Sequence, residues 1–167
     1  MESSDYHDAS NSSSFIGIYP LGSVAISHGK AILSMPDGAT ITHTVNNTYR
    51  CDNAINQFIH AIKVTGDGSQ YCGLYGYTAF NAVRYFENIA VKDTTMQKND
   101  APDMLYILYR DIIVFDHFNN KMTLVTLVPQ NNDAEAMKAA GEEALHHLET
   151  AINRQSVKPY AFHPVGN

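Results

Sequence analysis

The chain has 167 residues, 44% of them hydrophobic and 10% aromatic, so it can bury a core of its own, and its length favours one domain. Eleven Lys and Arg against 17 Asp and Glu give a formal net charge of −6, and the positive charges are scattered singly, which excludes generic nucleic-acid binding. The apolar runs are too short for a membrane span, and the acidic start Met1–Asp5 lacks the basic residues of a signal peptide. We therefore expect a soluble, cytoplasmic chain that binds neither nucleic acid nor membrane.

The first part of the chain has the pattern of β-strands. Residues 1–14 are polar and serine-rich, which indicates a flexible start, so order is expected from Phe15. Breaks at Pro20, Gly29-Lys30 and Pro36-Asp37-Gly38 separate the apolar runs that follow. The pattern predicts an antiparallel meander of four strands, at 15–19, 24–28, 31–35 and 40–45.

The hydrophobic period then changes to that of a helix. Ile55, Phe58, Ile59 and Ile62 recur at i, i+3, i+4 and i+7, which predicts a helix over 52–64. Asp52 or Asn53 would cap its start. The segments that follow are predicted as a strand at about 71–77, a short helical segment at 78–87 and a polar, flexible loop at 92–103.

The strongest strand candidates lie in the second half. Residues 104–116 and 121–128 are rich in β-branched and aromatic side chains, and the short segment His117–Asn120 between them predicts a long hairpin. An apolar stripe over 132–154 predicts the longest helix, and 158–167 reads as an extended linker. The fold class is α+β, a mainly antiparallel, sandwich-like β-sheet with two or three helices.

Patterns typical of catalytic or metal sites are not found in the sequence. Cys51 and Cys72 are lone cysteines that we interpret as buried thiols rather than as a disulfide or a zinc site. The adjacent His146 and His147 point about 100° apart on a helix. His28 and the nearby His43 lack a third ligand, so no metal is predicted. The glycines form no phosphate-binding motif and no serine lies in GxSxG, so no catalytic residue is assigned.

Three segments resemble one known family. Residues 73–87 read GLYGYTAFNAVRYFE and resemble the GxxGYxxxxxVRYxE stretch of anthranilate synthase component I, the chorismate-using subunit of tryptophan biosynthesis. Residues 102–117 are similar to that family's hairpin, which starts with PDM and ends with VFDH. Glu2-Ser3, followed by Phe15-Ile16-Gly17, resembles the LLES…SFI segment. Their order and spacing agree with the family, and the resemblance covers essentially the whole chain.

The resemblance implies an amino-terminal domain alone. Residues 1–157 would form this domain, and 158–167 would lead toward an absent chorismate-binding domain, so the chain looks like an excised or truncated piece. In the family, chorismate and magnesium bind that other domain, so neither catalysis nor a cofactor is expected here. The parent would be a lyase that makes anthranilate from chorismate and ammonia, with a glutamine amidotransferase subunit as partner. Loss of these neighbours would favour self-association.

The resemblance also implies candidate site residues. Glu2 and Ser3 would belong to the feedback site where tryptophan inhibits the enzyme, and Ser13 stands where some members have a lysine. Arg84 and Glu87 are placed for an i, i+3 ion pair, and together with Tyr85 they are a possible domain contact. The aromatic residues of 71–86 exceed what a core of this size needs. Two alternatives stay open: the same domain of an aminodeoxychorismate synthase, and a free-standing amino-acid-binding regulatory module.

Overall fold

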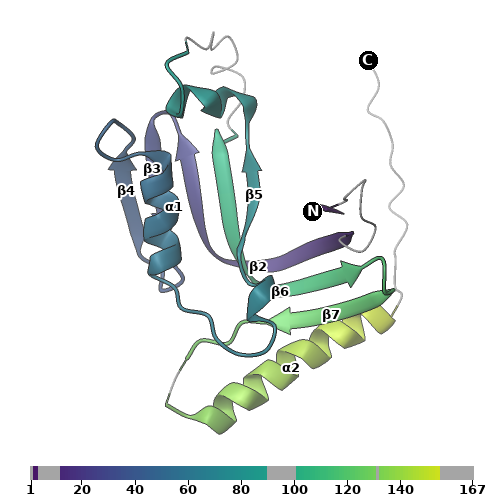
Figure 1. The fold of residues 1–167 in the computed structure, drawn as a ribbon. Coiled ribbons are helices and arrows are strands. Elements are labelled where there is room, and N and C mark those ends of the chain that lie inside the picture. The colour runs from purple at the N-terminus through teal and green to yellow at the C-terminus, as the bar shows by residue number, and fades with distance from the viewer. Residues whose placement is uncertain (1, 4–11, 90–100, 131, 155–167) are drawn as a thin grey trace, which may run out of the picture. The chain divides into compact units, whose positions relative to one another are not determined.

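The structure is a computed structural model, and it describes residues 2–3, 12–89, 101–130 and 132–154. The chain forms two compact units, Met1–Leu127 and Val128–Asn167, which we describe one at a time. The first unit is built on a seven-stranded antiparallel sheet that curls as a half-barrel (Figure 1). No helix within the described residues is long and apolar enough to cross a membrane.

Two long strands form the spine of the sheet. β2 (Ser13–Ser27) and β6 (Met104–Asp116) are antiparallel partners from Ser13 opposite Asp116 to Ile26 opposite Met104. The strand order is β4-β3-β2-β6-β5, and β1 and β7 are added to β2 and β6 (Figure 1). The predicted strand at 104–116 is confirmed, as its β-branched and aromatic residues fit the pleated surface.

The predicted break at Pro20 is wrong, because β2 continues through it. The pairing with β6 shifts register between Pro20 and Gly22, which marks a bulge with one extra residue on β2. Pro20 has no N–H to donate, and a bulge is one of the few places in a sheet where this loss is tolerated. Tyr19, just before it, has a φ of 57°, so the backbone is locally irregular.

The other strands predicted in this region are confirmed. β3 (Lys30–Ser34) pairs with β2 on one side and with β4 (Thr40–Thr44) on the other. The two-residue loop between β2 and β3, His28-Gly29, has positive φ at both positions, as a tight hairpin requires. The structure therefore contains the predicted antiparallel meander, but as three strands rather than four.

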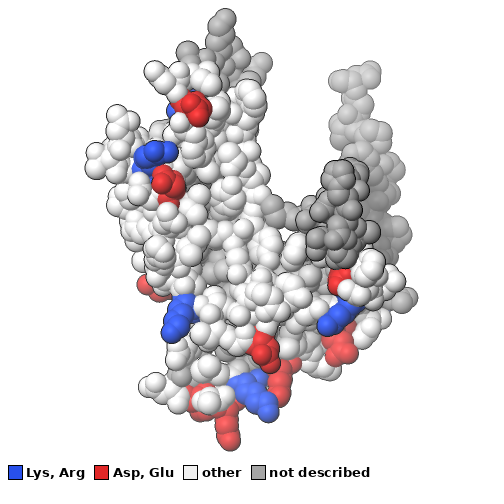
Figure 2. All heavy atoms as spheres, in the orientation of Figure 1, with Lys and Arg blue, Asp and Glu red and all other residues white. Residues whose placement is uncertain are grey.

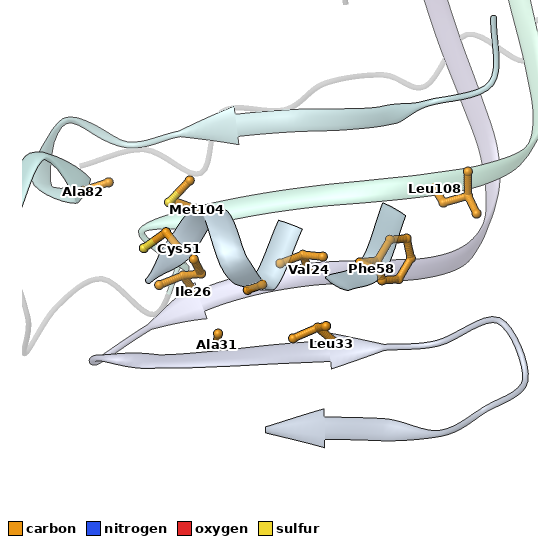
Figure 3. Packing of buried hydrophobic residues seen from close by; sticks show 10 residues of the cluster. Val24, Ile26, Ala31, Leu33, Cys51, Phe58, Ala82, Met104 and Leu108 are labelled. Carbon is orange, nitrogen blue, oxygen red and sulfur yellow. The ribbon is translucent and has the colours of Figure 1, made fainter. Parts of the chain in front are cut away.

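Helix α1 (Cys51–His60) covers part of this sheet. The N-cap is Arg50 and not the predicted Asp52 or Asn53; Asn53 lies at the third helical position, where its side-chain oxygen accepts a hydrogen bond of 2.8 Å from the Arg50 amide. The helix ends at His60, earlier than the predicted Val64. Phe58 is buried in the larger core, where α1 meets β2 and β3 (Figure 3). The buried members of this core are Val24, Ile26, Ala31, Leu33, Cys51, Ala54, Phe58, Ala82, Met104 and Leu108.

A smaller core lies where β6 meets β7 (Lys121–Thr126). Its buried members are Ile112, Val114 and Val125. The predicted hairpin is confirmed, and Asp116 holds its turn by accepting hydrogen bonds from the amides of Phe118 and Asn119. The remaining elements of this unit are η2 (Ser69–Tyr71), β5 (Leu74–Thr78), η3 (Phe80–Tyr85) and β1 (Glu2–Ser3).

The second unit contains helix α2 (Ala134–Asn153), which confirms the predicted long helix. Asp133 caps it, since its carboxylate accepts a hydrogen bond of 2.9 Å from the Ala136 amide. The linker predicted at 158–167 and most of the loop predicted at 92–103 lie outside the described residues, so both stay predictions. The mainly antiparallel α+β class with two main helices is confirmed.

Candidate functional site

The two segments with the most specific resemblance meet at one carboxylate. Asp103 directly precedes β6, and its Oδ1 lies 2.8 Å from Nη2 of Arg84 on η3. Its other oxygen accepts a hydrogen bond of 2.7 Å from the Tyr85 hydroxyl, which in turn accepts one of 3.1 Å from the Gly29 amide. The backbone is joined as well, because the Ala79 amide donates to the Asp103 carbonyl. η3, the start of β6 and the β2–β3 turn are thereby fastened together.

This junction is largely shielded from water. The side chains of Arg84 and Asp103 are only 21% and 13% exposed. Burial, followed by the hydrogen bond to Asp103, raises the pKa of the Tyr85 hydroxyl, so the phenol keeps its proton at neutral pH and donates this hydrogen bond. The ion pair of Arg84 thus goes to Asp103, whereas the sequence favoured Glu87, which is exposed. The role of Arg84, Tyr85 and Glu87 as a domain contact stays a prediction.

An aromatic pocket of about 240 Å³ lies across three strands of the first unit. Its wall consists mainly of aromatic rings, and the Phe15 and Tyr75 ring centroids are 5.5 Å apart. The Tyr109 ring lies directly over Gly17, where any Cβ would overlap it. The lining residues come from β2 (Phe15, Gly17), β5 (Tyr75, Gly76, Tyr77) and β6 (Tyr109, Ile112).

Two of the pocket's hydroxyl groups are already bound to the backbone. The Tyr75 hydroxyl donates to the Tyr71 carbonyl, and the Tyr77 hydroxyl donates to the Pro102 carbonyl at 3.2 Å. Among the residues that the structure describes, none of those that line the pocket is charged. Its volume exceeds the roughly 150 Å³ cavity that holds a benzene ring and lies below the range of about 300–1,000 Å³ for drug-sized ligands. The pocket therefore has room for one ring system.

The predicted tryptophan half-site lies on β1, next to the β2 strand that contributes to the pocket. Glu2 and Ser3 form β1, which pairs with the start of β2 so that Glu2 faces Ser14 and Ser3 faces Ser13. The next residue of β2, Phe15, lines the aromatic pocket. The backbone of Glu2 and Ser3 is therefore paired with the two β2 residues that directly precede Phe15 of the pocket lining. Tryptophan binding by Glu2 and Ser3 stays a prediction.

A buried carboxylate that the sequence reading missed lies in the middle of β6. Asp111 is 1% exposed and accepts hydrogen bonds from Arg110 (3.0 Å from Nε and 2.7 Å from Nη2) and from the Thr126 hydroxyl (2.6 Å). The Arg110 guanidinium lies 4.3 Å from the centre of the exposed Tyr19 ring. The sequence signal for this buried carboxylate was Asp111 itself, an acidic residue inside the apolar run of the predicted strand 104–116. Its hydrogen bonds indicate a structural anchor for β7.

The described residues do not form a metal site. No group of three or more His, Cys, Asp or Glu side chains within them could hold an ion. His43 instead stacks on Tyr49, with ring centroids 4.0 Å apart. Cys51 and Cys72 are free thiols, and burial raises the pKa of both.

Comparison with known proteins agrees with this description. A family model described as chorismate binding enzyme matches residues 5–165, so the chain belongs to the chorismate binding enzyme family. The solved structure of anthranilate synthase component I from Streptococcus pneumoniae TIGR4 is similar in fold, with a TM-score of 0.55 and 18% sequence identity. The match covers 82% of this chain and 29% of that chain. No curated protein matches. The resemblance found in the sequence is confirmed, and it is to part of such a protein.

Proposed function

We propose that this chain is the non-catalytic amino-terminal domain, regulatory and structural, of an enzyme of the anthranilate synthase component I type. The observation that carries the proposal is the coverage of the fold match, 82% of this chain against 29% of the solved chain. The whole enzyme would convert chorismate and ammonia or glutamine into anthranilate for tryptophan biosynthesis, with magnesium bound outside this chain.

The chemistry of the described side chains supports a non-catalytic role. The buried Asp111 carboxylate and the half-buried Asp103 carboxylate are bound to Arg110 and Arg84 and to hydroxyl groups of their own unit. Groups tied up in this way hold segments together, whereas an acid or base must reach its substrate. The described lining of the aromatic pocket offers ring faces and no charged side chain, which suits binding of a ring rather than its chemical conversion.

The pocket and β1 together support the regulatory part of the proposal. An amino acid with an aromatic side chain needs an apolar wall for its ring and polar groups for its charged ends. The pocket supplies such a wall, and β1, with Glu2 and Ser3, pairs with the start of β2 next to Phe15 of the pocket lining. In the isolated chain the ligand would meet only this wall, so much of the ring would stay in water.

Calorimetric titration of the isolated chain with tryptophan and with chorismate tests the proposal. Binding must offset the lost translational and rotational freedom of the ligand, and half a site offers few contacts to do so. We expect a tryptophan dissociation constant of about 1 mM or weaker, near −4 kcal/mol, with no change in Ser3→Ala, and equally weak chorismate binding.

The second candidate, a free-standing amino-acid-binding module, is favoured by the pocket itself. It requires a complete site within this chain. Micromolar tryptophan binding that Ser3→Ala abolishes would establish this second function and contradict the first.

A further inference from the structure

We draw no further inference here: the strongest candidate, the broad uncharged face over the sheet of the first unit (Figure 2), carries no proposal, because nothing in the structure shows what covers it.

Discussion

Arg84 and Asp103 are 19 residues apart in the sequence, and Nη2 of one lies 2.8 Å from Oδ1 of the other. This ion pair joins the two segments with the most specific resemblance to anthranilate synthase component I. It also fixes η3 against the sheet, since Tyr85 bonds the second oxygen of the same carboxylate. Asp103 of the PDM segment therefore holds Arg84 and Tyr85 of the VRY segment in place.

Removing the charge at this junction should destabilise the fold. In Asp103→Asn, the Arg84 guanidinium stays mostly buried without its carboxylate, and we expect a loss of about 1–3 kcal/mol in the free energy of unfolding. Arg50→Gln is the control, because Arg50 pairs with Asp52 on the surface, where both side chains are more than half exposed; it should cost less than about 1 kcal/mol. Urea denaturation measures both. Equal costs would show that the junction adds nothing.

Gly76 on β5 should tolerate no side chain. A Cβ at this position would overlap the backbone carbonyl of Leu105 on β6, so Gly76→Ala must push the two strands apart. We expect a loss of about 3 kcal/mol or more, as for a severe packing clash. Gly73→Ala is the matched substitution, because a Cβ there meets no atom within 4 Å, and it should change stability by less than about 1 kcal/mol. Thermal unfolding that ranks the two variants the other way would contradict this description of the β5–β6 contact.

The buried carboxylate of Asp111 leads to a prediction on β7. Thr126→Val keeps the shape of the side chain but removes the hydroxyl that donates to Asp111, so we expect a loss of about 1–2 kcal/mol. Thr123→Val, on the same strand and also half-buried, should change stability little. Urea unfolding of both variants measures the difference. A Thr126→Val chain as stable as the wild type would mean that this hydrogen bond does not help to hold β7.

The turn of the β6–β7 hairpin should weaken in acid. Hydrogen bonds from the Asn119 side chain and from the amides of Asn119 and Phe118 lower the pKa of the Asp116 carboxyl below its ordinary value of 3.8. A lowered folded pKa means that this contribution to stability is complete above pH 3.8 and is lost as the pH falls through the folded value.

Unfolding of wild type and Asp116→Asn, compared from pH 6 down to pH 2, checks this. The stability difference between the two chains should shrink at the acid end. A difference that is constant over the whole range would contradict the role of the ionised carboxylate.

The sequence predicted most of the elements, because their signals are local. The hairpin of β6 and β7 followed from β-branched residues, and α2 from its apolar stripe. The sequence predicted a strand break at Pro20, because the bulge that accommodates this proline within β2 depends on the pairing of β2 with β6. The aromatic pocket and the Arg84–Asp103 pair could not be predicted, since each brings together segments far apart in the chain, and only the strand register determines which side chains meet.

Anthranilate formation by the purified chain tests the central claim most directly. Fluorescence would be followed after chorismate, magnesium and ammonium are mixed with the chain, and also with the Asp103→Asn variant. We predict no anthranilate above the protein-free control for either chain, because the chain matches only 29% of the solved anthranilate synthase chain and the carboxylates of Asp103 and Asp111 are bound within the fold. Turnover that follows the wild-type chain through every purification step would contradict a non-catalytic domain.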